Sequence, residues 1–387
     1  MKLILHIGTH KTGTTALQRF LHANRAQLAV CGFHYATPPH GVVHANLIAN
    51  ALSIGKTRVV HTFLAKHTDL ARRRGAHTVL LSSENFYAMS VLSSMQRRQI
   101  RSDAVERDRI LIETLYSLMP EGITTPQVVC YFRRPDRYAE SLYNQHVKRG
   151  TIFDGTFAKF LPIIRPALFY NACIGSWSGV FGKSVVRLYE AVTGDIVGDF
   201  VRNVMNVDDV NQFRYVDEPA NERVGRDLLE FKRMRNRTAR FGERDLERTI
   251  LGLVDKEMDL RTSEPAYYQD FLSPDDRAEL LKLVEPDLVG LQASHGVPPF
   301  PPFDLAAAKA KWGPYPGLDE QRKQEIELHY DRISGRVGFR LERLALRSAS
   351  VLRRSVPLTG VLLDALKEVG AKRRLHGLLM GLQKGSG

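Results

Sequence analysis

A short segment near the N-terminus constrains the fold of this 387-residue chain more than any other part. Residues 3–7 form a continuous apolar run, residues 8–15 read GTHKTGTT, and residues 14–24 carry apolar side chains at helical spacing. Such an apolar run predicts a buried strand, and apolar residues three and four positions apart predict an amphipathic helix. We therefore expect a strand, a glycine-rich loop and a helix in direct succession.

Three later apolar runs predict further strands, and a polar turn and a helical pattern follow each of them. They lie at residues 77–82, 127–132 and 184–189. Apolar strands that alternate with helices predict a parallel sheet covered on both faces, in which ligands bind at the carboxyl ends of the strands. The expected fold class is α/β, a parallel β-sheet flanked by helices, with a helical C-terminal extension.

The domain boundaries are expected where the patterns change. Strand patterns stop at about residue 217, and charged helical patterns follow, including a helix that the letters SPDD predict to start at Ser273. The stretch VPPFPPFD is predicted to be an extended linker because it contains adjacent prolines. The expected parts are an α/β domain at 1–296 (core 1–217, helical part 218–296), the linker at 297–304 and a basic helical extension at 305–387.

Cysteine use and hydropathy bear on the compartment. Cys31, Cys130 and Cys173 form no CxxC or Cys/His metal spacing, which favours a reducing compartment over a disulfide framework or a zinc site. The N-terminus lacks the pattern of a signal peptide, and no apolar run approaches the roughly 18 residues that span a bilayer. We expect a cytoplasmic protein that is at most peripheral at the inner face of the membrane.

The formal net charge of +13 favours polyanionic partners, and the C-terminal segment 332–387 carries much of it, with twelve Lys and Arg against three Asp and Glu. Five of these arginines recur every three or four residues, so a helix would align them on one face. They are Arg332, Arg336, Arg340, Arg343 and Arg347. Such a basic amphipathic helix can lie on anionic lipid headgroups, or it can dock on the rest of the chain with its arginines in solvent. No nucleic acid is expected as a partner.

The loop at residues 8–15 is suited to an anion, because backbone N–H groups and the dipole of the following helix favour negative charge there. A nucleoside-triphosphate loop reads G-x-x-x-x-G-K-[ST], with lysine directly after the second glycine. Here Thr14 follows Gly13, and the lysine of the loop, Lys11, stands two residues before that glycine. The order of residues disfavours a P-loop kinase or NTPase, which stays an alternative.

The order K-[ST]-G-T-T after a strand resembles the P-loop-like phosphosulfate-binding loop of sulfotransferases that use 3′-phosphoadenosine 5′-phosphosulfate (PAPS). The resemblance implies that backbone and hydroxyl groups of the loop hold the 5′-phosphate of PAPS, and that the lysine lies beside the bridging oxygen that departs. The residues that take these roles are Lys11, Thr12, Gly13, Thr14 and Thr15. A plain strand-to-helix turn with threonine caps is the alternative.

A second motif of the same family, R-x-P followed by a serine eight residues after the arginine, matches the segment after the run at 127–132. Arg133, Pro135 and Ser141 stand at the required positions. The resemblance implies that Arg133 and Ser141 bind the 3′-phosphate of the cofactor, and the planar fork of arginine suits two phosphate oxygens. Spacing alone does not exclude that Arg134 or Arg137 shares the phosphate.

Other positions carry weaker predictions. Tyr189, the last residue of the run at 184–189, forms a Tyr-Glu pair similar to the family's segment near the adenine, although it could equally be a core-edge tyrosine. Attack by an acceptor hydroxyl requires a general base. Carbohydrate and protein-tyrosine members of the family use a glutamate and cytosolic small-molecule members a histidine, so Glu84 is favoured here, and His10 and His44 are the alternatives.

Two basic clusters remain. Lys148-Arg149-Gly150 is expected at a helix C-terminus, where cations and a glycine cap are favourable, although it could touch cofactor or acceptor. The cluster KRMRNR at 232–237 is interpreted as a solvated helix face, with a groove for an anionic acceptor as the alternative.

The resemblance covers roughly residues 1–217 and implies a sulfotransferase that moves a sulfuryl group from PAPS to a hydroxyl of a glycan, glycolipid or metabolite, without a metal. His10 stands where small-molecule members have proline, and no convincing K-x-H follows the second strand, so the chain looks more like bacterial carbohydrate or lipid-linked sulfotransferases. A non-enzymatic protein that binds polyanions or membranes through its basic C-terminal segment is a further alternative.

Overall fold

The computed structural model describes residues 1–38, 44–91, 102–148, 153–182, 184–215, 224–237, 244–260 and 264–335. The chain divides into two compact units. Unit 1 consists of Met1–Leu142, Phe157–Ala220 and Leu272–Ala310, and unit 2 consists of Tyr143–Thr156, Asn221–Phe271 and Lys311–Gly387. Every residue of the candidate site belongs to unit 1.

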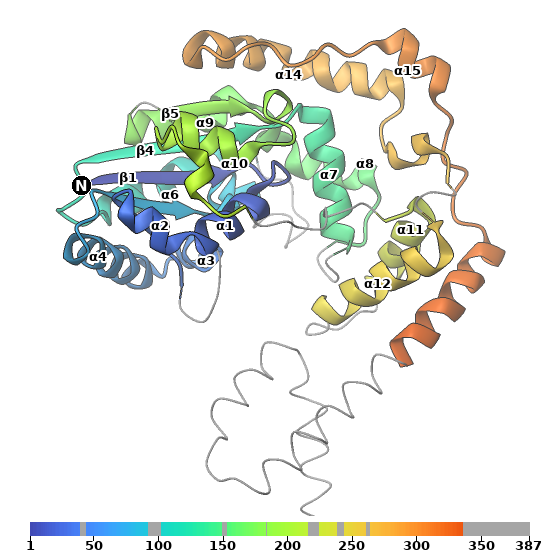
Figure 1. Ribbon diagram of the computed structural model, residues 1–387. Coiled ribbons are helices and arrows are strands. Elements are labelled where there is room, and N and C mark those ends of the chain that lie inside the picture. Colours follow the sequence, from blue (N-terminus) through green and yellow to red (C-terminus); the bar gives the residue numbers. More distant parts are fainter. Residues whose placement is uncertain are drawn as a thin grey trace, which may run out of the picture. The chain divides into compact units, whose positions relative to one another are not determined.

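Unit 1 contains a parallel sheet of five strands in the order β2-β3-β1-β4-β5. Figure 1 labels β1, β4 and β5 of this sheet. The strands are β1 (Lys2–Gly8), β2 (Phe33–Tyr35), β3 (Thr78–Ser82), β4 (Thr125–Phe132) and β5 (Ser184–Leu188). Leu5 in the central strand lies opposite Leu81 of β3 and Val128 of β4. The α/β class and the four predicted strands are confirmed. Strand β2 was not predicted because three residues are too few for a recognisable pattern.

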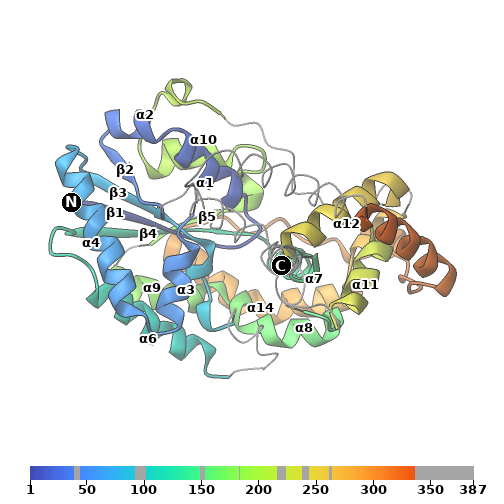
Figure 2. The same cartoon turned by 90° about the horizontal axis from the view of Figure 1, so that it is seen from below.

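Helices cover both faces of this sheet (Figure 2). One face carries α1 (Thr14–Ala23), α2 (Arg25–Val30), α10 (Ile196–Asp199) and the short helix Phe200–Val204. The other face carries α3 (Asn46–Ser53), α4 (Thr57–Arg73), α6 (Ala104–Ser117) and α9 (Tyr170–Phe181). On the first face Leu17 and Phe20 of α1 pack with Tyr131 and Phe200, all nearly inaccessible to solvent. This core fixes the start of α1 against the end of β1.

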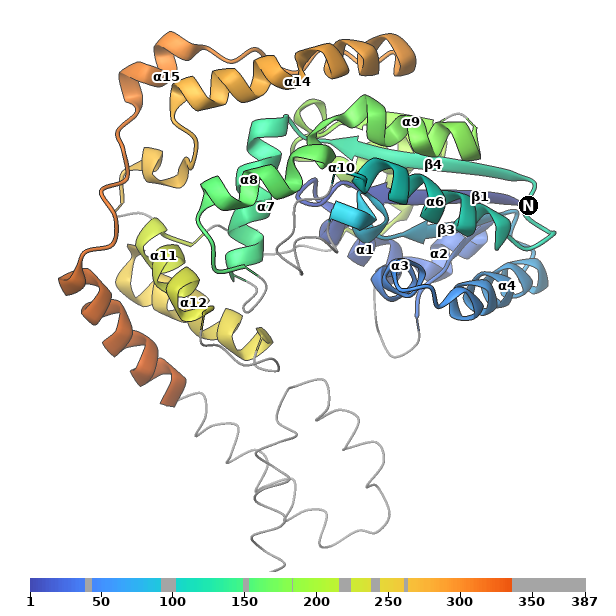
Figure 3. The same ribbon diagram turned by 180° about the vertical axis from the view of Figure 1, so that it is seen from behind.

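Helix α14 (Pro274–His295) runs over α9, as Figure 3 shows. It begins where the sequence predicts, because the Ser273 hydroxyl oxygen accepts the backbone N–H of Asp276 at 3.1 Å and Pro274 occupies the first turn. Unit 1 also contains the first half of α7 (Pro135–Lys148), α8 (Phe157–Ile164) and most of α15 (Leu305–Lys311).

The proline-rich stretch 297–304, which the sequence predicts to be a linker, lies inside unit 1. The reason is that it packs on Arg134, whose guanidinium donates to the carbonyl oxygen of Pro301 at 3.3 Å and lies 5.8 Å from the ring centroid of Phe303. The predicted helical part 218–296 is shared between the two units.

Unit 2 contains α11 (Arg226–Arg235), α12 (Arg244–Met258) and a helix at 320–335. Arg332, the first arginine of the predicted basic helix, hydrogen-bonds Glu257 of α12 at 2.5 Å. The other predicted arginines lie in the segment 336–387, outside the described residues. In the described part of the chain no helix combines the length and hydropathy that crossing a bilayer would require.

Candidate functional site

The order of the strands identifies one crevice in the sheet. After β1 the chain continues to β2 on one side, whereas after β4 it continues to β5 on the other side. Strands β1 and β4 are neighbours, so the segments that follow them diverge. Ligands of open parallel sheets bind in such a crevice, at the carboxyl ends of the strands. We name the two segments the first junction (residues 8–14) and the second junction (residues 132–135).

The first junction is a tight turn stabilised by its own residues. Lys11 and Gly13 adopt left-handed backbone conformations, with φ of 68° and 77°. The hydroxyl of Thr12 donates to the carbonyl oxygen of Thr9 at 2.7 Å, and the N–H of Thr9 donates to the carbonyl oxygen of Tyr131 on β4 at 2.9 Å. The turn is therefore tied both to itself and to the neighbouring strand.

Two features favour glycine at position 13. A left-handed φ is unfavourable for residues with a side chain, and a Cβ atom there would lie 3.0 Å from Cγ2 of Ile196. Helix α1 starts at the next residue, Thr14, and its first turn contains no acidic side chain. The first N–H groups of a helix have no partner inside the helix and carry partial positive charge, so this turn is suited to an anion.

The second junction brings Arg133 to the first junction. Its guanidinium lies at a long hydrogen-bond distance, 3.5 Å, from the carbonyl oxygen of Lys11, and 5.5 Å from the ring centroid of Tyr189. Tyr189 is the first residue after β5 and is half-buried. Three features that the sequence predicts separately thus lie together at the carboxyl ends of β1, β4 and β5. They are the loop that contains Lys11, the side chain of Arg133 and the ring of Tyr189.

The backbone of the second junction is held from two directions. The hydroxyl of Tyr170 donates to the carbonyl oxygen of Arg133 at 2.6 Å, and the N–H of Arg134 donates to the carboxylate of Glu190 at 2.8 Å. The ring of Tyr170 stacks on Phe132 with a centroid separation of 4.2 Å. These contacts fix the direction in which the Arg133 side chain leaves the strand.

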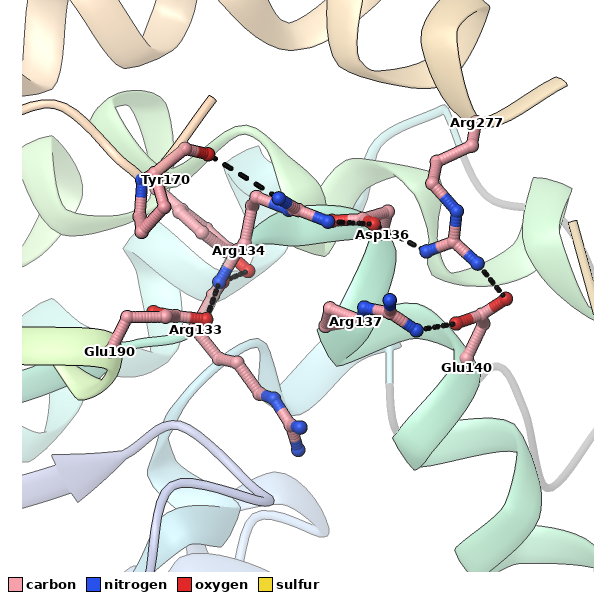
Figure 4. Close-up of polar contacts among 9 residues, drawn as sticks. Arg133, Arg134, Asp136, Arg137, Glu140, Tyr170, Glu190 and Arg277 are labelled. Carbon is pink, nitrogen blue, oxygen red and sulfur yellow. Dashed lines mark hydrogen bonds and ion pairs between the residues drawn. The ribbon is translucent and has the colours of Figure 1, made fainter. Parts of the chain in front are cut away.

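The two neighbouring arginines face carboxylates instead of the first junction. Arg134 makes a two-pronged contact with Asp136, at 2.7 and 2.9 Å, and Arg137 lies 3.6 Å from Glu140. Figure 4 shows the side chain of Arg133 pointing away from this group of charges. Arg133, the arginine that the motif assigns, is therefore the one of the three whose guanidinium lies at the first junction. Whether Arg134 or Arg137 shares a phosphate stays a prediction.

Ser141 follows Glu140 on α7 and is buried, with 4% of its surface exposed. Its predicted partnership with Arg133 stays a prediction. Thr14 is buried at the start of α1, and Thr15 beside it is exposed.

Glu84 lies directly after β3, close to the first junction. A Cβ atom on Gly8 would lie 3.1 Å from Cα of Glu84, so the two backbones approach closely. Its carboxylate is only 6% exposed and accepts hydrogen bonds from the side-chain amides of Gln18 at 2.8 Å and Asn46 at 3.2 Å. Burial alone would raise the pKa of Glu84, but the positive charge of His10 and these hydrogen bonds outweigh it and lower the pKa to about 2.

Both alternative bases belong to the same end of the sheet. His10 lies in the first junction, is 5% exposed and acts electrostatically on Glu84. His44 directly precedes Ala45, whose N–H donates to the carbonyl oxygen of Ser82 at the end of β3. The amide of Gln18 also contacts the Ser82 hydroxyl at 3.3 Å, so Glu84 belongs to a buried polar network.

The cluster at 232–237 in unit 2 differs from its interpretation as a solvated face. Lys232 is completely buried, and its ammonium group hydrogen-bonds the side-chain oxygen of Asn236. Arg233 pairs with Glu230 at 2.7 Å. Lys148 is the last residue of α7, at the predicted helix C-terminus, while Arg149 and Gly150 lie outside the described residues.

Comparison of the chain with models of protein families, with curated proteins and with solved structures gives no match. In the described part of the chain, no three His, Cys, Asp or Glu side chains are grouped as a metal site would require.

Several residues of the site escaped sequence reasoning. Gln18 was detectable in principle, because a polar side chain on the apolar face of a helix requires a buried partner. Asn46 lies after a loop without a recognisable pattern, and Tyr170, Glu190 and Arg277 act on the second junction from distant segments.

Proposed function

We propose that this chain is a sulfotransferase that uses PAPS as its sulfuryl donor. The observation that carries the proposal is the meeting of Arg133 with the Lys11 turn at the crevice between β1 and β4. PAPS is an anion with phosphate groups at both ends of its ribose, so it requires two separate cationic sites close together. A turn that offers N–H groups and an arginine that faces it supply this pair.

In the proposed complex the 5′-phosphosulfate binds the turn from Lys11 to Thr15, as a P-loop-like phosphosulfate-binding loop. The 3′-phosphate binds Arg133 and Ser141. Tyr189 lies beside the adenine, where its ring also limits the positions open to the Arg133 side chain. The hydroxyl of Thr12 already donates within the turn, so its main contribution is to hold the shape of the phosphate site.

The proposed reaction is a direct in-line transfer. The acceptor oxygen forms a bond to sulfur while the bond between sulfur and the bridging phosphate oxygen breaks, and the acceptor proton passes to a base. Negative charge develops on the departing 5′-phosphate of 3′-phosphoadenosine 5′-phosphate (PAP), and the Lys11 ammonium stabilises it. One positioned donor of this kind contributes roughly 3 kcal/mol to the transition state.

Glu84 is the proposed base, and His10 and His44 are its alternatives. The depressed pKa of Glu84 keeps it ionised at neutral pH, as a base requires. The same low pKa makes it a weak proton acceptor, and Gln18 and Asn46 already donate to its two oxygens. An increase of activity with pH near the ordinary pKa of histidine, about 6.5, would assign the proton to a histidine instead.

The proposed acceptor is a hydroxyl of a carbohydrate or glycolipid. Residues 332–387 are proposed to bring the enzyme to an anionic membrane surface, within the cytoplasm, where a lipid-linked acceptor would be found. Co-sedimentation of the full-length protein with liposomes that contain anionic lipid should fall when these residues are deleted. Unchanged co-sedimentation would leave no support for this membrane role.

The donor assignment is tested by calorimetry with PAP in metal-free buffer. Wild-type protein should bind PAP, and Arg133→Ala should weaken binding by about 2 to 3 kcal/mol, since two charge-assisted hydrogen bonds are lost. Arg58→Ala, which removes an exposed arginine of α4, controls for the loss of one positive charge. Tighter binding of ATP with magnesium would overturn the proposal in favour of a kinase or NTPase. Anion binding that survives Lys11→Ala and is lost with the C-terminal segment would favour the non-enzymatic alternative.

A further inference from the structure

Helix α14 contacts the first turns of α7 through one buried arginine. Arg277, 3% exposed, donates to Asp136 at 2.5 Å and to Glu140 at 2.8 Å, and neither carboxylate is exposed to solvent. Figure 4 shows Arg277 reaching from its helix between the two carboxylates. The N–H of Leu272, just before α14, donates to Glu140 as well, at 3.2 Å. These contacts fix the part of α7 that begins at the second junction and leads directly to Ser141.

The same helix contacts the start of α9 farther along. The carboxylate of Asp287 accepts the backbone N–H groups of Asn171 at 2.8 Å and Ala172 at 3.0 Å, which places it as a cap on α9. Helix α9 begins at Tyr170, whose hydroxyl donates to the carbonyl oxygen of Arg133. Through Asp287, α14 thus also holds the residue that fixes the backbone of Arg133.

We propose that α14 is the positioning element of the 3′-phosphate site, in which Arg277 and Asp287 hold the two segments that carry Ser141 and Arg133. The proposal rests on the proposed function and deepens it, because it assigns the recognition of the 3′-phosphate to a helix that touches no ligand. Arg277 and Asp287 are positioning residues, and the phosphate contacts belong to Arg133 and Ser141.

Physical reasons favour positioning over stabilisation. A buried ion pair adds little stability relative to an apolar replacement, because the desolvation of both charges offsets their attraction. Two-pronged hydrogen bonds between arginine and phosphate, by contrast, depend strongly on direction. A guanidinium that bridges two carboxylates fixes a helix start more rigidly than an apolar contact, because its planar fork sets both distances and angles.

The test compares two nucleotides that differ only in the 3′-phosphate. PAP carries phosphates at the 3′ and 5′ positions, and adenosine 5′-monophosphate carries only the second. The ratio of their dissociation constants, measured by calorimetry on the full-length protein, therefore reports the contribution of the 3′-phosphate alone. General loss of structure weakens both nucleotides and leaves the ratio almost unchanged.

Arg277→Lys keeps the charge but cannot bridge Asp136 and Glu140. It should weaken PAP by about tenfold, the effect of roughly one misplaced charge-assisted hydrogen bond, and leave adenosine 5′-monophosphate within about twofold. Tyr170→Phe removes one hydroxyl and keeps the stacked ring, so it tests the second segment if Arg277→Lys fails to fold, with an expected loss of about threefold to fivefold. Asp275→Asn is the matched control, since Asp275 lies on the same helix and pairs with exposed Lys309.

Three outcomes are distinguishable. A reduced ratio in Arg277→Lys and Tyr170→Phe, with a wild-type ratio in Asp275→Asn, supports the proposal. Folded variants with an unchanged ratio, or an equal loss for both nucleotides, overturn it while the proposed function survives. A wild-type protein that binds PAP no more tightly than adenosine 5′-monophosphate overturns the proposed function, and the positioning role with it.

Discussion

The two junctions that meet at the crevice are built in different ways. The first junction depends mostly on its own residues, through the left-handed conformations of Lys11 and Gly13 and the hydrogen bond from Thr12 to Thr9. The second junction depends on residues from elsewhere in the chain, namely Tyr170, Glu190 and, through α7, Arg277.

The difference teaches which parts of a site can be found in a sequence. A turn built from local hydrogen bonds and glycine conformations needs particular residues at fixed spacing, so it is visible as a motif. When distant segments position a site, the local sequence reveals only the binding residue and not the residues that position it. Substitutions at the two junctions should therefore differ in their effects on stability and on nucleotide binding.

The largest effect is expected from Gly13→Ala. A Cβ at a φ of 77° costs about 1 kcal/mol, and the contact with Ile196 at 3.0 Å adds about 1 to 3 kcal/mol of overpacking. Urea unfolding should therefore show a loss of about 2 to 4 kcal/mol, and PAP binding should be lost with the shape of the turn.

Gly75→Ala is the matched control for this variant. Gly75 has a similar φ of 69°, is exposed and has nothing within 4 Å of its Cβ position, so only the conformational cost of about 1 kcal/mol should remain. Equal destabilisation by the two variants, with PAP binding intact in both, would show that the first junction tolerates a side chain.

Glu84 tests whether the first junction is wholly local, because it lies close to Gly8 but belongs to the segment that follows β3. Its pKa in the folded state, about 2, lies below the ordinary value of 4.5. Ionised Glu84 therefore contributes stability above pH 4.5, and this contribution, on the order of 3 kcal/mol, is lost as the pH falls from 4.5 toward 2. Glu84→Gln should remove this part of the acid sensitivity, as measured by urea unfolding at several pH values.

Glu106→Gln is the comparison for that experiment, since Glu106 lies on the surface of α6 with more than half of its side chain exposed. It should leave the pH dependence of unfolding almost unchanged. A wild-type curve that is flat between pH 4.5 and 2, or a Glu84→Gln curve that follows the wild type, would contradict the depressed pKa.

The sequence predicted the central elements well because they follow local rules. The four longer strands are rich in apolar residues, and the start of α14 is marked by a serine cap and a proline. Lys11, Arg133 and Tyr189 were found by motif, and the structure brings them together. The pairing of Arg134 with Asp136 and of Arg137 with Glu140 needed the structure, because spacing alone does not show which way these side chains point.

The proline-rich stretch 297–304 shows what a local sequence pattern does not reveal. Adjacent prolines indicate an extended backbone, but they do not reveal whether that backbone is free or packed. Residues 297–304 lie outside helices and strands, and Pro301 and Phe303 contact Arg134, which no pattern within the stretch indicates. The burial of Lys232 likewise depends on Asn236, one helical turn away, and on its position inside unit 2.

The smallest effects come from one hydrogen bond at each junction, and they distinguish the two junctions most sharply. Thr12→Val removes the bond to Thr9, and Glu190→Gln weakens the bond to the N–H of Arg134, each at a cost of about 1 kcal/mol in stability. Thr12→Val should weaken PAP and adenosine 5′-monophosphate equally, because both present a 5′-phosphate to the first junction. Glu190→Gln should weaken PAP alone, because the second junction serves the 3′-phosphate.

Calorimetry with both nucleotides measures these effects, and Thr12→Ser, which keeps the hydroxyl, should bind both nucleotides as the wild type does. If Glu190→Gln weakened the two nucleotides equally, the second junction would not be a separate phosphate site. The two junctions would then differ in how they are stabilised, but not in which phosphate they bind. A selective loss of PAP would instead mean that a single distant carboxylate helps to decide which phosphate the protein recognises.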